Sequence, residues 1–333
     1  MSGSRKRYSN NQKGVIFTGP QCIYILLGSY LLNNVKLHCN IVVSITLNVV
    51  IQKKVNMTML CCVQIPMTES EWLKISDDFF KKWQFPHCIG AMDGKHIAIQ
   101  APPNSGSLYY NYKHFFSVVL LAVVDANYRF IYVDVGNYGR NADGGVFSNS
   151  SLAEALAANY LNIPSADNSI DGINNLPYTL VADDAFPLKQ YIMKPYALRG
   201  LTAEQRIFNY RLSRARRVVK NAFGIISNRF RIFTRAIALA PHRVDKITMA
   251  ACCLHNFLMR DQTTSANYVA DLLDTDSHQP TCTMQHVSRQ GCNRASNQAC
   301  AMRDKLCAYF NSEHMVQSVG HLCTNGTITS VAC

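Results

Sequence analysis

Apolar residues recur between residues 66 and 260 with the spacings of regular secondary structure. Residues 68–82 begin with a capping box and then place Trp72, Ile75 and Phe79 on one face, which predicts a helix. Residues 88–100 are typical of a strand, with Asp93 in its middle. The nearly continuous apolar run 114–126 predicts a strand that is buried on both faces. After a short turn, residues 129–139 are expected to return as its hairpin partner.

The second half of this region adds helices to the predicted sheet. A glycine-rich loop containing Asp143 is expected after residue 136, followed by a short helix over Ser148–Ala158. Residues 176–188 predict a further short strand that ends at Asp183. Helices are predicted over residues 202–224, 243–259 and 297–310. The pattern therefore indicates an α/β fold, in which helices pack on a mixed sheet.

The helix predicted over 202–224 carries two rows of side chains. One row is apolar and faces a core, and the row beside it contains Asn209, Ser213, Arg216 and Lys220. A row that flanks a buried face lies at the rim of the core, where it can reach a cleft. The pattern leaves open whether this row is catalytic or only basic.

Hydropathy also divides the chain into three parts. We expect residues 1–65 to form an atypical apolar N-terminal segment, residues 66–262 the main domain, and residues 263–333 an irregular cysteine-rich tail. The apolar run 15–32 has about the length of a membrane span, but Gly19, Pro20 and Gln21 interrupt it. A signal peptide and a degenerate N-terminus are the alternatives, and of the three we favour the last. Membrane attachment is not expected.

The net charge of +12 is concentrated in one segment. Residues 194–246 contain thirteen Lys or Arg residues against Glu204 and Asp245. This density indicates either a solvated basic face or an electrostatic footprint for nucleic acid. The thirteen cysteines include no C-x-x-C pair, so free thiols in a reducing compartment are favoured over a zinc site in the tail.

Three aspartates, Asp93, Asp143 and Asp183, lie in or at the ends of apolar or glycine-rich segments. A carboxylate in such surroundings is costly unless it is paired or binds a metal ion. Converging carboxylates hold Mg²⁺ or Mn²⁺, which prefer oxygen ligands, and such ions support phosphoryl displacement. Taken singly, each aspartate is better explained as a turn cap or as part of a structural ion pair than as a metal ligand.

Four ordered motifs resemble those of the PIF/Harbinger group of DDE-superfamily transposases, which includes Harbinger transposase-derived nucleases. The motifs are FPHCIGAMDGKHI, VDVGNYGRNADGGVFSNSSL, LVADDAFPL and FNYRLSRARRVVKNAFG. The resemblance covers about residues 66–260 and implies an RNase H-like mixed sheet flanked by helices. It also implies a nuclease that cleaves DNA with a divalent metal, Mg²⁺ or Mn²⁺, held by Asp93, Asp143 and Asp183. Such proteins are expected in the nucleus, with the cytoplasm as a second location.

The sequence departs from this group at one position that matters for activity. The last carboxylate of the group is a Glu, and the matching residue here is Lys220. A positive charge at a position meant to complete a cation site opposes metal binding. Two hypotheses follow: a transposase-derived nuclease impaired by Lys220, or a non-catalytic module that binds DNA or protein on the same fold.

The resemblance also bears on partners. Residues 1–65 do not resemble the DNA-binding region found upstream in the group, so DNA recognition is expected to be lost or to come from a partner of the Myb/SANT-like type. Six residues are candidates for nucleic-acid binding, with solvated surface residues as the alternative: Lys95, His96, Arg211, Arg214, Arg216 and Arg217.

Overall fold

The computed structural model describes residues 62–166, 175–260, 284–286 and 295–312. Nearly all of the N-terminal segment, and four of the tail cysteines with any zinc site there, lie outside these residues. Within the described part of the chain, no helix has both the length and the apolar composition that crossing a membrane requires.

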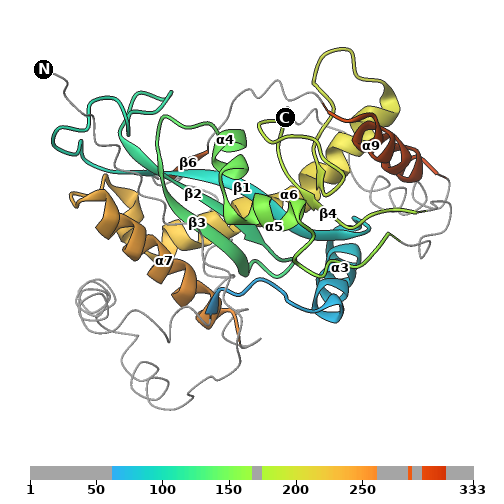
Figure 1. The fold of residues 1–333 in the computed structure, drawn as a ribbon, viewed down its shortest axis with the longest axis horizontal. Coiled ribbons are helices and arrows are strands. Elements are labelled where there is room, and N and C mark those ends of the chain that lie inside the picture. The colour runs from blue at the N-terminus through green and yellow to red at the C-terminus, as the bar shows by residue number, and fades with distance from the viewer. Residues whose placement is uncertain (1–61, 167–174, 261–283, 287–294, 313–333) are drawn as a thin grey trace, which may run out of the picture.

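A mixed sheet forms the centre of the fold (Figure 1), with strands in the order β3-β2-β1-β4-β5 and with β6 also paired to β1. β1 is antiparallel to β2 and to β6 and parallel to β4; β2 is antiparallel to β3, and β4 is parallel to β5. The strands are β1 (Cys88–Ala98), β2 (Ser117–Val124), β3 (Phe130–Tyr138), β4 (Thr179–Val181), β5 (Ile192–Met193) and β6 (Met284–His286).

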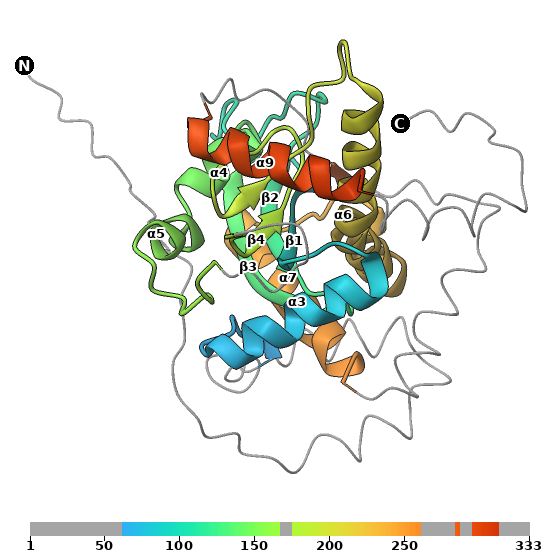
Figure 2. The ribbon, with the colours of Figure 1, turned by 90° about the vertical axis from the view of Figure 1, so that its right-hand side faces the viewer.

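Helices cover both faces of this sheet. Figure 2 shows α6 on one side and α4 with α5 on the other. α3 and α9 lie near α6 in the same view. This arrangement is the RNase H-like α/β fold expected from the sequence. The helices are α3 (Glu69–Trp83), α4 (Asp143–Ser148), α5 (Ser151–Ala157), α6 (Ala203–Arg229), α7 (Pro241–Leu258) and α9 (Asn297–Phe310), with a 3-10 turn, η2, at Arg231–Thr234.

Most predicted elements are confirmed, with three differences near the aspartates. The glycine-rich loop contains a helix, α4, whose first residue is Asp143. The single helix expected over residues 148–158 is interrupted because Ser150 caps α5, accepting a hydrogen bond from the Ala153 N–H. The strand expected over residues 176–188 is also shorter, since pairing stops at Val181.

β3 is stabilised by a side chain of α7 rather than by a further strand. The Asn256 Oδ1 accepts the Phe130 N–H at 2.8 Å, and its Nδ2 donates to the Phe130 carbonyl at 2.7 Å. Asn256 thus satisfies both backbone groups that a neighbouring strand would bond. This contact fixes α7 to the sheet, so Asn256 has a structural role.

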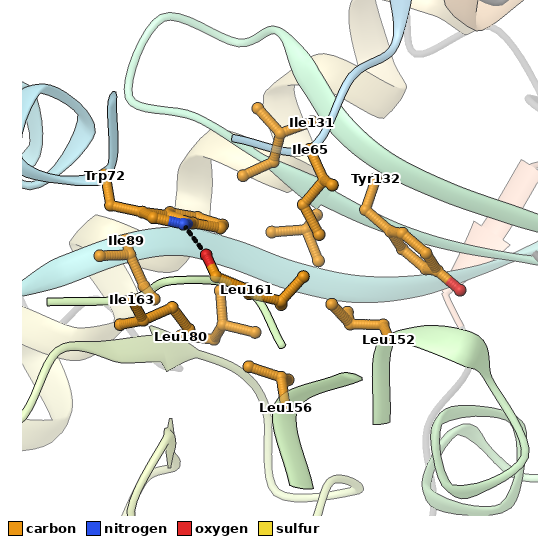
Figure 3. Close-up of a pocket in the computed structure, with 11 residues that line it drawn as sticks. Ile65, Trp72, Ile89, Ile131, Tyr132, Leu152, Leu156, Leu161, Ile163 and Leu180 are labelled. Atoms are coloured by element: carbon orange, nitrogen blue, oxygen red, sulfur yellow. Dashed lines mark hydrogen bonds between the residues drawn. The ribbon is translucent and has the colours of Figure 1, made fainter. Parts of the chain in front are cut away.

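A small cavity in the helix-covered core is shown in Figure 3. Its volume is about 10 Å³, and it is lined by aliphatic side chains and by the rings of Trp72 and Tyr132, with the Trp72 Nε1 turned to donate to the Leu161 carbonyl at 2.7 Å. A cavity this small and this apolar does not hold an ordered water. It is a packing defect of the core and not a ligand site.

A carboxylate pair between α7 and β3 makes stability dependent on pH. Burial and the neighbouring Asp134 raise the pKa of Asp245 to about 7, and burial raises that of Asp134 to about 6. An acid whose pKa is higher in the folded than in the unfolded state stabilises least at high pH. Stability is therefore expected to fall as the pH rises from about 4 to about 7.

Asp245→Asn is expected to remove much of this pH dependence. The variant should melt a few degrees above the native protein at pH 8, and the difference should vanish near pH 4. Melting curves followed by circular dichroism across this range measure it. Asp77→Asn, which changes an exposed carboxylate on α3, is the control and should leave the pH dependence intact. A native protein whose melting temperature rises from pH 4 to pH 8 would contradict the assignment.

Candidate metal centre

The three predicted aspartates come from three different elements that meet at one edge of β1. Asp93 lies in the middle of β1, opposite Ala122 of β2. Asp183 follows β4 by two residues, and the parallel register pairs Ala91 with Val181. Asp93 and Asp183 each lie two residues beyond this pair, so they are side by side. Asp143, at the start of α4, completes the group.

The strand pairing leaves space at this position. β4 pairs with β1 from Cys88 to Ala91, and β6 pairs with it from Lys95 to Ile97. Among the described strands, none pairs with residues 92–94 on that edge of β1. This unpaired stretch of β1 lets the Asp93 carboxylate approach Asp143 and Asp183, which lie outside the strand.

The three carboxylates converge closely and are withdrawn from solvent. One oxygen from each of Asp93, Asp143 and Asp183 lies within 4.8 Å of the other two. Asp93 and Asp143 have no exposed surface, and Asp183 is 7% exposed. The convergence that spacing along the chain could not establish is thus present in the structure.

Gly94 permits the approach of Asp143. A Cβ atom at Gly94 would lie 2.7 Å from the Asp143 Cγ and closer still to its Oδ1. Such contacts are far below van der Waals separation, so any larger residue would displace the carboxyl group. Gly94 belongs to the site although it bears no ligand. The only trace of this in the sequence is its place directly after Asp93.

The electrostatics of the group show how strongly the carboxylates repel each other. Burial, and then the charges of Asp93 and Asp183, raise the pKa of Asp143 to about 9. Burial and then Asp93 raise the pKa of Asp183 to about 6. Without a cation, Asp143 is therefore protonated at neutral pH.

Few polar neighbours offset this repulsion. The Asp183 Oδ1 accepts the Ala185 N–H at 3.0 Å. Among the described residues, neither buried carboxylate oxygen of Asp143 has a hydrogen-bond partner. Buried oxygens that lack donors, arranged around a shared centre, fit a hard divalent cation of the kind bound by oxygen ligands. The residues present are thus suited to a metal site in which Asp93, Asp143 and Asp183 supply the ligands.

Two basic residues of α6 face the same group from one side. Arg216 lowers the pKa values of both Asp143 and Asp183, opposing the larger effect of burial. Lys220 follows one turn later. Burial of the ammonium and repulsion by Arg216 lower its pKa, whereas attraction to Asp93 and Asp183 acts in the opposite direction. Lys220 is only partly buried, and its charge lies within electrostatic range of Asp93 and Asp183.

The other residues predicted to bind nucleic acid divide into two groups. Arg214 and Arg216 are half-buried and Arg217 is exposed, so all three offer surface to a ligand. Lys95, His96 and Arg211 are buried instead, at 8%, 0% and 2% exposure. The Lys95 Nζ lies 5.8 Å from the centroid of the Phe223 ring. Burial removes the geometric basis for placing these last three against phosphate.

Replacing Gly94 with alanine is expected to weaken metal binding while leaving the fold intact. The added methyl group displaces the Asp143 carboxylate, and a misplaced ligand typically costs roughly 10- to 100-fold in affinity. Calorimetric titration with Mn²⁺ measures the change. Gly145→Ala is the matched control, because a Cβ at this position of α4 meets no atom within 4 Å. Equal Mn²⁺ affinity in the two variants would contradict the role given to Gly94.

Comparison with known proteins agrees with this geometry. The family described as DDE superfamily endonuclease matches residues 92–256, a range that contains the three aspartates and Lys220. No solved structure gives a significant match.

Curated relatives are similar over a comparable region. "Protein ALP1-like" of Arabidopsis thaliana is 28% identical over 218 residues, which cover 63% of this chain and 52% of that protein. "Putative nuclease HARBI1" is 27% identical in Bos taurus and 26% in Homo sapiens, in each case over 58% of this chain and 52% of the relative. The chain thus spans about half the length of the curated relatives it matches. From the matched family, the motif order and the aspartate cluster together, residues 92–256 of the chain belong to the DDE superfamily endonucleases, with distant homology to Harbinger-derived proteins.

Proposed function

We propose that this protein is a metal-dependent nuclease that hydrolyses phosphodiester bonds of DNA. The observation that carries the proposal is the convergence of Asp93, Asp143 and Asp183 within 4.8 Å in a buried position. Three buried acidic groups this close together destabilise a fold unless a bound ligand offsets their desolvation and repulsion. A divalent cation offsets both directly. Mg²⁺ or Mn²⁺ is the proposed cofactor.

The site suits hydrolysis of a phosphodiester. A divalent cation held by the three aspartates would supply a water of lowered pKa and would offset charge that develops on the phosphate. The Arg216 guanidinium, beside Asp143 and Asp183, can donate to a phosphate oxygen. Arg214 and Arg217 extend the positive surface of α6 along the DNA backbone, where contacts fix position without reading sequence.

The partners and location that we propose follow from the same function. DNA is the substrate, and its binding should weaken steeply with salt because the contacts go to phosphates. A DNA-binding partner of the Myb/SANT-like type would direct the protein to its sites. The protein would act in the nucleus, with a further pool in the cytoplasm.

Plasmid nicking tests the enzymatic proposal. The full-length protein with Mn²⁺ is expected to convert supercoiled plasmid to the open-circular form, and EDTA should stop the reaction. Asp93→Asn should reduce nicking to background, since it removes a ligand charge from the centre of the site. Asp77→Asn, an exposed carboxylate on α3, should nick at the native rate. Nicking that survives Asp93→Asn would show that it arises elsewhere or from a contaminant.

A second function, a non-catalytic module that binds DNA or protein, is favoured by one observation. Lys220 places a positive charge near Asp93 and Asp183, where a cation would otherwise be bound. A native protein that binds DNA at low salt without nicking it in Mg²⁺ or Mn²⁺ would support this function. The same result would contradict the proposed nuclease activity.

A further inference from the structure

The loop between β1 and β2 ends in an ordered hairpin formed by residues 109–117. The Ser117 N–H donates to the Tyr109 carbonyl at 2.8 Å, and the Asn111 N–H donates to that of Phe115 at 2.9 Å. The Asn111 Oδ1 accepts the N–H groups of Lys113 and Phe115 at 2.9 and 3.3 Å, which closes the tip. These bonds give the tip one conformation, although it projects from the sheet.

A chain of hydrogen bonds anchors the hairpin to the strand that carries Asp93. The Asn111 Nδ2 donates to the Ser117 Oγ at 2.9 Å, and that oxygen lies 2.9 Å from the His96 Nδ1. His96 is fully buried, and burial followed by the charges of Lys113 and Lys95 lowers its pKa to about 4, so the ring is neutral. On the same face of β1, Gly94 precedes His96 by two residues, roughly 7 Å, and the Asp143 carboxyl group lies against Gly94. The hairpin is therefore fixed close to the metal centre.

Two aromatic rings are nevertheless left facing solvent at this tip. Tyr110 is 39% exposed and Tyr112 is 45% exposed. Tyr110 is steadied by an edge-on contact with Phe116, at 5.1 Å between centroids. Tyr112 packs against His96 at 5.9 Å, and the Lys113 Nζ lies 5.6 Å from its centroid. The rings thus keep fixed orientations while part of their surface stays open.

Lys113 is the charged side chain of the loop that carries the rings. Residues 99–117 contain no Asp or Glu. On the other side of the β1 terminus, Ile99 pairs with Ile237, and the exposed Arg235 lies two residues before that contact. Figure 1 shows the loop leaving the end of β1. Exposed aromatic faces amid cationic side chains are the features that bind unpaired nucleotides, because bases stack on the rings and phosphates meet the cations.

We propose that Tyr110, Tyr112 and Lys113 form a platform that binds unpaired nucleotides of the DNA beside the cleavage site. This inference rests on the proposed function, since it takes DNA as the ligand. It further specifies the substrate as DNA with a single-stranded segment next to the scissile phosphate. Stacking is tolerant of sequence, so the platform selects unpaired over paired DNA and reads no particular base. A duplex keeps its bases stacked on each other and leaves the rings without a partner.

Binding to labelled oligonucleotides in EDTA tests the platform without requiring cleavage. The full-length protein is titrated into a single-stranded 20-mer and into the matching duplex, and binding is followed by fluorescence anisotropy. Tyr112→Ala is expected to weaken single-strand binding about tenfold, and the double variant Tyr110→Ala/Tyr112→Ala further, with duplex affinity changed less than about twofold. Tyr112→Phe keeps the ring and should bind as the native protein does. Tyr160→Ala, which removes an exposed ring outside the hairpin, should have no effect.

A 2-aminopurine base in the oligonucleotide reports stacking directly. The native protein and Tyr112→Phe should quench its fluorescence, and Tyr112→Ala should not. Native-like single-strand affinity in the double variant, or equal losses for single strand and duplex, would overturn the platform. Plasmid nicking is measured separately. If the protein does not nick plasmid but its single-strand binding depends on the rings, the nuclease proposal fails and the platform proposal stands. If it nicks plasmid but its single-strand binding does not depend on the rings, the nuclease proposal stands and the platform proposal fails.

Discussion

Lys220→Glu is expected to increase Mn²⁺ affinity and plasmid nicking by about ten- to a hundredfold. The substitution replaces a positive charge near Asp93 and Asp183 with a carboxylate at the position where the resembling group supplies its last ligand. Two unit charges about 5 Å apart interact by roughly 3 kcal/mol at an effective dielectric constant of 20. Because Lys220 is partly exposed to solvent, screening reduces this figure, and the expected gain in affinity is correspondingly smaller.

Two further variants separate the causes of that gain. Lys220→Gln removes the repulsion without adding a ligand and should fall between the native protein and Lys220→Glu. Lys246→Glu makes the same change of charge on the exposed surface of α7 and should leave both Mn²⁺ affinity and nicking unchanged. If Lys246→Glu raised nicking as much as Lys220→Glu, net charge would be the cause. Unchanged affinity in both Lys220 variants would place residue 220 outside the site.

Asp143→Asn should raise the melting temperature of the metal-free protein by at least about 5 °C at pH 7 and above. Burial and two neighbouring aspartates raise the pKa of Asp143 to about 9, far above that of an unfolded chain. A group of this kind favours folding fully at low pH, and its contribution is lost as the pH rises from about 4 to about 9. The neutral amide removes this loss and can donate to the remaining carboxylates. A gain of about 2 kcal/mol corresponds to this shift.

The same variant should lose the stabilisation that a metal provides. In EDTA, its advantage over the native protein should grow from pH 5 to pH 9. On addition of Mn²⁺, the native protein should melt at a higher temperature, because the cation binds only the folded state, whereas Asp143→Asn should hardly respond. Asp77→Asn should behave as the native protein in both series. A variant that melts below the native protein at every pH would show that the Asp143 carboxylate stabilises the metal-free fold.

The site follows from the sequence as far as local pattern and motif order reach. Asp93 and Asp183 lie in the middle and at the end of segments whose hydropathy predicts strands, Asp143 lies in a glycine-rich segment, and the motifs give their order. Their approach depends on the pairing of Ala91 with Val181, ninety residues apart, and hydropathy carries no information about such a register. Gly94 is similarly hidden, since its importance comes from a contact with Asp143 that only the folded chain makes.

Burial explains where the prediction of the nucleic-acid surface went too far. The sequence predicts that most arginines of residues 202–224 meet solvent or DNA, and a long helix packed on a sheet must bury part of its circumference. Arg211 is therefore covered while Arg217 is exposed, and His96 is hidden because β1 is buried along its whole length. Charge density locates the basic helix, and only packing decides which of its residues meet a ligand.

The packing of α9 decides where the catalytic unit ends. Phe310 is 1% exposed and lies between Phe85 and Phe208, at centroid distances of 5.2 and 6.1 Å, and Tyr196 donates to Asp304 at 2.6 Å. β6 comes from the same part of the chain and pairs with β1 beside the aspartates. A fragment that stopped at residue 262 would open an aromatic hollow and leave the strand of Asp93 with an unpaired edge, a template for aggregation. A stable fragment that carries the site is therefore expected to need β6 and α9 as well as residues 62–260.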